Sequence, residues 1–573
     1  SAADAGAPDR SRIQALPPVA AYEAIADAAT GIGDDLRAEE VIEVDLAPEG
    51  NERKQRFQAE ALVGDATASL VWLPMNRDAM RLCWRVILTG KSSGELYQVL
   101  IDAENGEPQV RHCWTAYFQQ ASFRVFDSDS PTPGTPGWTS PTPQAQPTFR
   151  PQVDKPNVSS TASPNGWIMD GRTTTIGNNV DAHLDILNQN PPIQYDQAIF
   201  QPAQARPSGT LVGNDLRFWF TADLSQPPKP MPQGANPASV NQKAAVVNAF
   251  YWCNWMHDKL YGFGFTEAAG NFQWDNLGRG PVDPDGNPTG HHDPVLVDVQ
   301  DAAEPASGSA LRNQNRMSAT PYDGDAPRML LQLFDGPLML VPQEKERDAA
   351  LAAEIILHEY THGMNMRLVG HGTGVGGLFG LDEGWADFMA MACLSQAGND
   401  PAQTYPQGGY IARNWKWVNG TQTRVEANYY YGLLPFPYST SLSKNPLTFK
   451  DLDPAQGSQH AGVARSPTFP ADLNHPDNAY VKAMQLWAVT LWEMRGNLVA
   501  NRGFTTGNDL AMRLVVDSLK LCPPNPNFLQ ARDALLLADQ VYTGGANKTA
   551  IWQAFKNRGM GARATSPAGT DRK

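Results

Sequence analysis

The N-terminal part of the chain alternates apolar and polar residues in the way that is typical of β-strands. The alternation runs through residues 70–117 and is clearest at 81–88, RLCWRVIL. Because successive side chains of a strand point to opposite faces, this pattern indicates strands with one buried face. Turn sequences such as AENG at 103–106 separate the runs. We therefore expect a small antiparallel sheet domain with a helix over about residues 18–29.

The composition changes at residue 127, where a segment rich in proline, serine and threonine begins and continues to residue 163. Proline fixes φ and removes a backbone donor, so regular elements are disfavoured there. The segment predicts a linker or an extended strap along the surface.

Helical periodicity begins at residue 240 and dominates the chain after residue 348. Residues 240–261 carry apolar side chains at helical spacing. Residues 270–324 are rich in glycine, proline, asparagine and aspartate, which predicts long loops with short strands. Further helices are expected over 352–368, 383–395 and 479–498, with two more before Gly559. The second half of the chain is therefore predicted to be mainly α-helical.

The length and composition indicate a soluble globular protein with more than one unit. A chain of 573 residues exceeds what one hydrophobic core usually holds, so two or three folded units are expected. Hydrophobic residues make up 41% of the chain, and no apolar run reaches membrane length. The net charge of −15, without clustered Lys and Arg, argues against a nucleic acid or an anionic membrane as partner.

Five cysteines are too few and too scattered for a disulfide scaffold or a Cys-rich zinc site. Cys83 and Cys113 lie in one segment, and a bridge between them or two separate thiols both stay open. The chain begins at Ser1, which fits a removed export signal as well as a trimmed chain.

The candidate chemistry begins at His358-Glu359-Tyr360-Thr361-His362. Residues four apart on a helix lie one turn above each other, so both imidazoles can reach one metal ion. Such an ion keeps an open position for water, lowers the pKa of that water toward roughly 7, and leaves Glu359 beside it as a base. A helix that carries these residues by coincidence is the alternative, which the motif alone leaves open.

A second predicted helix supplies carboxylates to the same site. Residues 380–387, GLDEGWAD, begin this helix after a glycine-rich turn, with Glu383 and Asp387 on one face. Glu383 completes a His, His, Glu metal site as the candidate third ligand. Asp387 can accept the other ring N–H of His358 and fix its tautomer. Alternatively, Glu383 is only a favourable charge at a helix N-terminus and Asp387 is a solvated residue.

At these residues the chain resembles the thermolysin-like zinc peptidases, whose third ligand is the glutamate of an E-x-x-x-D motif. More specifically, it resembles the fungalysin family of secreted metallopeptidases. Two long strings carry this resemblance, NAFYWCNWMHDKLYGFGFTEAAGNFQ at 248–273 and FPYSTSLSKNPLTF at 436–449. Shorter strings lie at 292–301, 319–329 and 531–539. The resemblance covers nearly everything after about residue 122.

The resemblance implies an α+β fold with a two-lobed zincin catalytic region. Residues 122–345 are then the β-rich N-terminal lobe, and residues 346–573 are the helical lobe that carries the zinc site. Residues 1–121 resemble the PepSY-like pro-region of these enzymes, although an unrelated accessory domain is the alternative. The resemblance also implies a secreted, extracellular endopeptidase that acts on proteins or peptides, with the pro-region covering the cleft until it is cleaved.

One family string is altered in this chain. Fungalysins carry H-x-x-G-E-x-W before a long helix, and its histidine is the counterpart of the one that stabilises the oxyanion. The matching stretch here is VKAMQLW at 481–487, so Val481 stands in the place of the histidine. Tyr480, Lys482 and His475 are the candidate donors that could replace it, and each could equally be structural.

An acidic loop offers oxygen ligands for calcium, although it lacks the spacing of an EF-hand and an ordinary turn is the alternative. Its residues, with three aspartates downstream, are Asp283-Pro284-Asp285-Gly286-Asn287, Asp293, Asp298 and Asp301. Three functions stay open at this point. They are an active zinc endopeptidase, a zinc-binding but catalytically weak protein that grips peptides or a partner, and a latent pro-enzyme.

Overall fold

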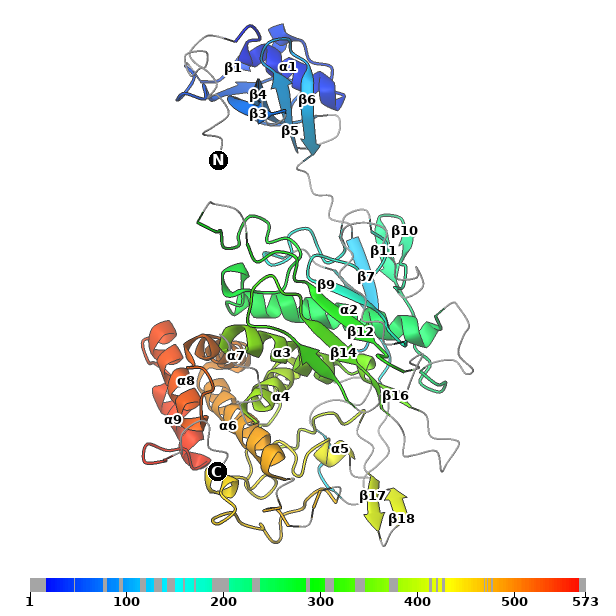
Figure 1. Ribbon diagram of the computed structural model, residues 1–573, viewed down its shortest axis with the longest axis vertical. Coiled ribbons are helices and arrows are strands. Elements are labelled where there is room, and N and C mark those ends of the chain that lie inside the picture. Colours follow the sequence, from blue (N-terminus) through cyan, green and yellow to red (C-terminus); the bar gives the residue numbers. More distant parts are fainter. Residues whose placement is uncertain are drawn as a thin grey trace. The chain divides into compact units, whose positions relative to one another are not determined.

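The computed structural model describes residues 17–565 and divides the chain into two compact units, Ser1–Tyr117 and Phe118–Lys573 (Figure 1). Within this span, the described residues exclude 46, 76–79, 92–95, 114–119, 128–136, 142–149, 158–159, 170–171, 188–205, 229–237, 285–288, 304–313, 335–345, 370–379, 412–414, 419–420, 425–427, 468, 471 and 476–477.

The first unit is a six-stranded antiparallel sheet with one helix packed on its face. The strand order is β1-β2-β3-β4-β5-β6. The elements are α1 (Ala21–Ile32), β1 (Ile42–Glu43), β2 (Gln55–Gln58), β3 (Ala66–Pro74), β4 (Met80–Thr89), β5 (Leu96–Asp102) and β6 (Pro108–Cys113). Ile25 of α1 is buried with Trp84, Val86 and Val99 of the sheet. The predicted sheet domain and its helix are therefore confirmed.

The bridge between Cys83 and Cys113 is not formed. Cys83 is a buried free thiol on β4, and burial raises its pKa to about 11. It lies opposite Asp102 at one end of β5, whereas Cys113 on β6 lies opposite Tyr97 at the other end. A disulfide requires the two Cα atoms to lie within about 7 Å, which this register does not allow.

Two four-stranded sheets form the β-rich part of the second unit, with the orders β10-β11-β7-β8 and β13-β14-β12-β9. Their strands are β7 (Gln120–Val125), β8 (Val153–Pro156), β9 (Val180–Leu184), β10 (Thr210–Val212), β11 (Asp215–Phe218), β12 (Val295–Val299), β13 (Arg316–Ser318) and β14 (Arg328–Leu331). β12 runs parallel to β9 and β14, and β13 lies antiparallel to β14 at the edge. Shorter pairs are β15 (Leu333–Phe334) with β16 (Arg347–Asp348) and β17 (Trp415–Val418) with β18 (Thr421–Arg424).

The proline-rich segment 127–163 is not free of regular structure as the sequence suggested. Its residues 153–156 form β8, which pairs antiparallel with β7. Arg124 of β7 holds Asp154 of β8 through two hydrogen bonds of 2.7 and 2.9 Å. The strand lies at the edge of its sheet, where the prolines upstream do not deprive a neighbouring strand of donors.

The long helix α2 (Val240–Gly262) connects the β-rich part to the helical part. It packs against β7, β9 and β12 on the sheets and against α3, and Figure 1 shows it alongside the sheet of β9, β12 and β14. Ser239 caps its first turn by accepting the N–H of Gln242 at 3.2 Å. The helix predicted over 240–261 is therefore confirmed.

The C-terminal half is helical, as expected. Its helices are α3 (Ala353–Val369), α4 (Leu381–Leu394), α5 (Asn428–Tyr431), α6 (Ala479–Arg502), α7 (Phe504–Leu521), α8 (Phe528–Thr543) and α9 (Lys548–Asn557). Short 3₁₀ turns lie at Ala38–Glu40, Glu267–Ala269, Ala349–Leu351 and Phe449–Leu452. The prediction of two helices after α6 was wrong, because α7, α8 and α9 all follow it. Pro523-Pro524 separates α7 from α8, and Gly544-Gly545 separates α8 from α9. Proline cannot continue a helix because it lacks a backbone N–H, and glycine readily adopts the left-handed conformation that ends one.

Arg558, which directly follows α9, binds and orders the loop that contains Ser439 and Asn445. Its side chain is fully buried, pairs with Glu493 at 3.0 Å and donates to the carbonyls of Asn445 and Ser439 at 2.8 and 3.0 Å. Removing one partner of a buried ion pair leaves a charge without compensation. We expect Arg558→Met to lower the free energy of unfolding by about 3–5 kcal/mol in urea denaturation. The exposed Arg502→Met is the control and should change it little.

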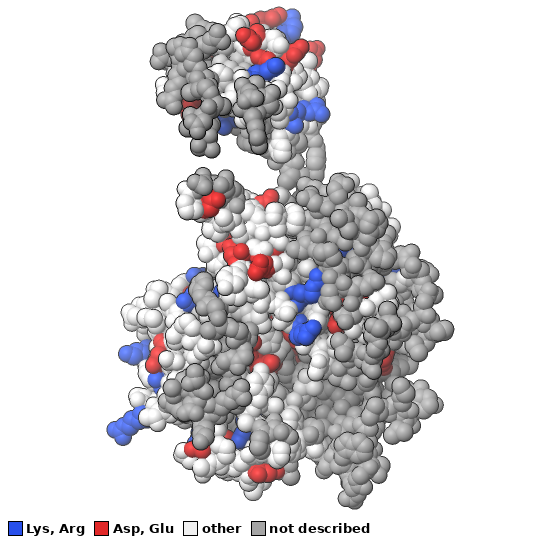
Figure 2. All heavy atoms as spheres, viewed as in Figure 1, with Lys and Arg blue, Asp and Glu red and all other residues white. Residues whose placement is uncertain are grey.

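On the face shown in Figure 2, the described Lys and Arg side chains of the second unit are scattered among acidic ones. Among the described helices, none combines the length and the apolar character that crossing a membrane requires.

Candidate metal centre

Two helices bring the predicted metal ligands together. His358 and His362 lie four residues apart on α3, and their Nε2 atoms are 3.0 Å from each other. Glu383, in the first turn of α4, brings its Oε2 to 3.2 Å from Nε2 of His358 and 3.6 Å from Nε2 of His362. One ligand atom of each of the three residues therefore faces a common point.

Gly384 allows α4 to approach α6 closely enough to aim Glu383 at the histidines. A Cβ atom at residue 384 would lie 2.7 Å from Cβ of Trp487 and 2.8 Å from the carbonyl oxygen of Met484. Gly380, with a φ of +77°, begins the helix against the same stretch of α6. The glycine after the candidate ligand thus has a packing reason.

The outward ring nitrogen of each histidine is held by a carboxylate. Nδ1 of His358 lies 2.7 Å from Oδ1 of Asp387, as the sequence predicted, and Nδ1 of His362 lies 2.7 Å from Oδ2 of Asp382. Both contacts direct Nε2 toward Glu383 and fix the tautomer. Tyr438 in turn donates its hydroxyl to Asp387.

Sequence reasoning missed Asp382, its neighbour Asn365 and Tyr438. Asn365 donates to Oδ1 of Asp382 at 2.8 Å. Asp382 could have been identified from the sequence, because it directly precedes Glu383. Like Asp387, it is a carboxylate on the same helix that can accept the second ring N–H of a histidine. Tyr438 is far from both helices in the sequence, and only its place in the string at 436–449 marked it.

The electrostatics of the cluster favour a cation. Burial lowers the pKa of His358, but the charge and hydrogen bond of Asp387 raise it to about 10. Burial acts likewise on His362, whose pKa Asp382 raises well above its usual range. Burial would raise the pKa of Glu383, yet the two histidines hold it below its usual range. Three carboxylates around two imidazoles thus create a negative site that a divalent ion would neutralise.

Glu359 lies beside the candidate ligands but binds neither His358 nor His362. Its side chain is buried, and its Oε2 has no hydrogen-bond partner among the described residues. Burial raises its pKa. Burying a carboxylate oxygen without a hydrogen-bond partner costs free energy of folding. The position of Glu359 beside the candidate ligands is therefore consistent with a role in catalysis.

The three candidates for the missing oxyanion donor lie in different surroundings. Tyr480, in the first turn of α6, donates its hydroxyl to Oε1 of Glu383 at 3.0 Å. Lys482 is buried, and its Nζ donates to the carbonyl of Asp451 at 2.7 Å. His475 is exposed in the turn before α6. Only Tyr480 among the three has a contact with the ligand cluster.

The acidic residues that suggested calcium do not form one group. Asp285 and Asn287 lie outside the described residues. Asp293 pairs with Arg367 at 2.9 Å. Asp298 and Asp301 instead lie near Asp185.

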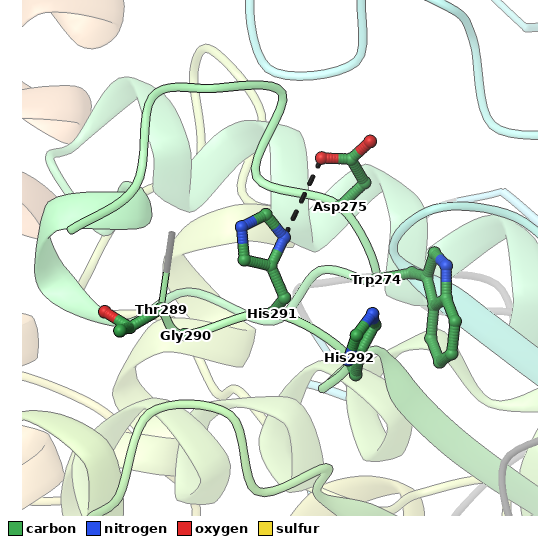
Figure 3. A pocket seen from close by; sticks show the side chains of 6 residues that line it. All are labelled: Trp274, Asp275, Thr289, Gly290, His291 and His292. Atoms are coloured by element: carbon green, nitrogen blue, oxygen red, sulfur yellow. Dashed lines mark ion pairs between the residues drawn. The ribbon is translucent and has the colours of Figure 1, made fainter. Parts of the chain in front are cut away.

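A separate hollow of about 520 Å³ lies on the surface of the second unit. Figure 3 shows His291 turned toward Asp275, 3.8 Å between Nδ1 and Oδ1, and His292 beside the ring of Trp274. None of its lining residues belongs to the ligand cluster. The chemistry of the side chains therefore identifies the candidate site, and the size of a hollow does not.

Comparison with known proteins identifies the family. A family model described as fungalysin metallopeptidase (M36) matches residues 138–564. The chain belongs to the fungalysin family. Extracellular metalloproteinase MEP of Pyricularia oryzae is 34% identical to it, over 90% of this chain and 70% of that protein. Extracellular metalloproteinases of Aspergillus flavus and Aspergillus niger are 32% and 31% identical, each over 90% of this chain and 70% and 69% of theirs.

This fungalysin is therefore a metallopeptidase with a mixed α+β fold, β-rich in its N-terminal region and helical in its C-terminal region. The resemblance predicted from the sequence is confirmed. The family model begins after the first compact unit, whereas the pairwise matches extend over nearly the whole chain.

Proposed function

We propose that this fungalysin is a secreted zinc endopeptidase that hydrolyses peptide bonds in proteins. The observation that carries the proposal is the geometry of the ligand set. Nε2 of His358 and of His362 converge with Oε2 of Glu383, while carboxylates hold both Nδ1 atoms. Two nitrogens and one carboxylate oxygen are the donor set of catalytic zinc sites. Relatives named extracellular metalloproteinases support secretion.

The chain supplies a base for the attacking water. When bound, zinc would lower the pKa of a water molecule in its open position and polarise the scissile carbonyl. Glu359 would accept a proton from the attacking water through its carboxylate, whose buried Oε2 has no hydrogen-bond partner among the described residues. The same residue then delivers the proton to the leaving amine.

Tyr480 is the proposed donor to the oxyanion in place of the histidine that Val481 replaces. Its hydroxyl reaches Glu383 while the side chain stays 43% exposed, so it can turn to a substrate carbonyl without unfolding its surroundings. A hydrogen bond to the developing negative charge lowers the barrier. Lys482 is already bound to a backbone carbonyl and would have to leave it.

We propose that the edge strand β13 aligns the substrate. Among the described strands it pairs only with β14, and it packs against α3, which carries the histidines. A peptide in extended conformation can add to such an edge through main-chain hydrogen bonds.

The lobes are proposed to lie at 122–345 and 346–573.

The first unit is proposed to be a pro-region that keeps the enzyme latent. Its end is better set at Tyr117 than at residue 121, because β7 begins at Gln120 and pairs with β8 and β11 of the second unit. Cleavage between the units would then leave the second unit whole.

A casein assay before and after limited proteolysis between the units tests the function. We expect hydrolysis after cleavage, loss of it with 1,10-phenanthroline and recovery with zinc, and one zinc per chain by metal analysis. Full activity before any cleavage would contradict latency. Zinc at one per chain with no hydrolysis after cleavage would instead support a catalytically weak zinc protein.

The carboxylates behind the histidines should set metal affinity. We expect Asp382→Asn and Asp387→Asn each to weaken zinc binding by about 10–100-fold. Competition with a chromophoric chelator measures this. Asp533→Asn, on the surface of α8, is the matched control. Unchanged affinity in both variants would show that these contacts only support the fold.

A further inference from the structure

A second group of carboxylates lies away from the metal centre, at one end of the sheet β13-β14-β12-β9 (Figure 1). Asp185 directly follows β9, Asp298 lies within β12, and Asp301 follows β12. Because β9 and β12 run parallel, with Leu184 opposite Val299, their carboxyl ends lie side by side at the same end of the sheet. One oxygen of each aspartate lies within 4.8 Å of the others, and all three side chains are buried.

Arg316 lowers the pKa of Asp301 through its charge, and the other positive charges nearby are already engaged. Arg328 binds Asp298 through two contacts of 2.6 and 2.9 Å. Arg206 binds Asp181 at 2.8 Å, and His183 lies between Asp181 and Asp298 at 3.4 and 2.8 Å. These groups compensate Asp298 and Asp181. They leave the charge of Asp301 to other partners.

Asp301 carries the observation that points to a ligand. Gln332 donates to its Oδ2 at 3.0 Å, whereas its Oδ1 is buried and has no hydrogen-bond partner among the described residues. The side chain is 0% exposed. Burial raises the pKa of Asp301, and the charges of Asp298 and Asp185 raise it further. A buried carboxylate oxygen without a donor is expensive in a folded protein, so a partner is missing there.

We propose that Asp185, Asp298 and Asp301 bind one calcium ion. All the donors are oxygens, and calcium takes roughly 6–8 oxygen ligands in flexible geometry, with backbone carbonyls and water completing the set. Zinc prefers nitrogen and sulfur, and the imidazole beside the group, His183, is engaged by two aspartates. The ion would supply the partner that Oδ1 of Asp301 lacks.

The ion would fasten the loop after β12 to the end of β9. The loop already touches the end of β9 and the end of β14, because Ala302 donates its N–H to the carbonyl of Asp185 and Asp301 donates its N–H to the carbonyl of Leu331, each at 3.0 Å. Gln300 and Ala302 both have positive φ, 54° and 51°, so the loop is held in a conformation that non-glycine residues rarely adopt. Calcium at this point would therefore stabilise the β-rich lobe.

The test uses the full chain carrying Glu359→Gln, which prevents self-digestion and leaves the aspartates intact. The protein is stripped with EDTA, reloaded with one equivalent of zinc, and heated with and without millimolar calcium. We expect Tm to rise by about 3 °C or more when calcium reaches a hundred times its Kd. Metal analysis after equilibrium dialysis should find one calcium beside one zinc. This readout does not require peptidase activity, so it stands apart from the proposed function.

Variants assign the effect to the cluster. Asp301→Asn keeps the size of the side chain and should abolish the shift in Tm, whereas Asp283→Asn, in the loop that the sequence first suggested, should keep it. If Asp301→Asn does not fold, the dialysis of the parent protein still decides. Absence of bound calcium and of any shift, two zinc ions in place of zinc and calcium, or a shift that Asp301→Asn preserves would each overturn the proposal.

Discussion

The substitution Glu359→Gln is expected to lower kcat for casein hydrolysis by about 10²–10⁴-fold while zinc stays bound. The amide has the shape of the carboxylate but cannot accept the proton of the attacking water. Glu359 binds neither histidine, and its buried Oε2 has no partner in the part of the chain that the structure describes, so the proposed ligand set should survive the change. KM should stay near its original value, because the substrate is bound by other groups.

Glu354→Gln on the same helix is the control, since Glu354 is also buried on α3, one turn before His358, but is not part of the candidate ligand group. It should keep its activity. Glu383→Gln should differ from both by losing zinc. A Glu359→Gln enzyme that retains a tenth or more of its kcat would contradict the role of a general base.

Phenylalanine at position 480 is expected to lower kcat by about 10²-fold, the effect of removing one oxyanion donor. The variant loses only the hydroxyl that lies 3.0 Å from Oε1 of Glu383. If the hydroxyl merely positioned Glu383, zinc affinity would fall and kcat at saturating zinc would not. The two measurements together separate the roles.

A second variant makes the Tyr480 prediction sharper. Val481→His restores the histidine of the family string, so the double variant Tyr480→Phe with Val481→His should recover part of the lost kcat. Tyr542→Phe, an exposed tyrosine on α8, should change nothing. Full activity in Tyr480→Phe alone would refute the assignment.

Local patterns predicted the helices, and the proposed ligand set could be named from the sequence, because both depend on spacing along one element. His358 and His362 share a face of one helix, and Glu383 and Asp387 share a face of the next, so residue numbers alone place them. The alternation in residues 70–117 likewise contained β4, β5 and β6 and part of β3, whereas β1 and β2 lie before it. The strand β8 was missed because its pairing partner, β7, lies across a proline-rich segment that hid it.

Contacts between distant segments could not be predicted in this way. Asp185 lies far from Asp298 in the sequence, and only the parallel pairing of β9 and β12 brings the two together. Tyr438 reaches Asp387 from a loop that Arg558 fixes from the end of the chain. Such contacts depend on the packing of the whole lobe, which no short string records.

The close contact of α4 with α6 has a mechanical consequence. Glu359 and the histidines lie on α3, Glu383 on α4 and Tyr480 on α6, and α4 packs directly against both α3 and α6. The proposed metal ligands, base and donor are thus parts of a single packed block, with Gly384 where α4 meets α6. A change at the β-rich side of the second unit would alter which peptides enter but leave these groups in register. Specificity can therefore be altered at the β-rich side without retuning the chemistry.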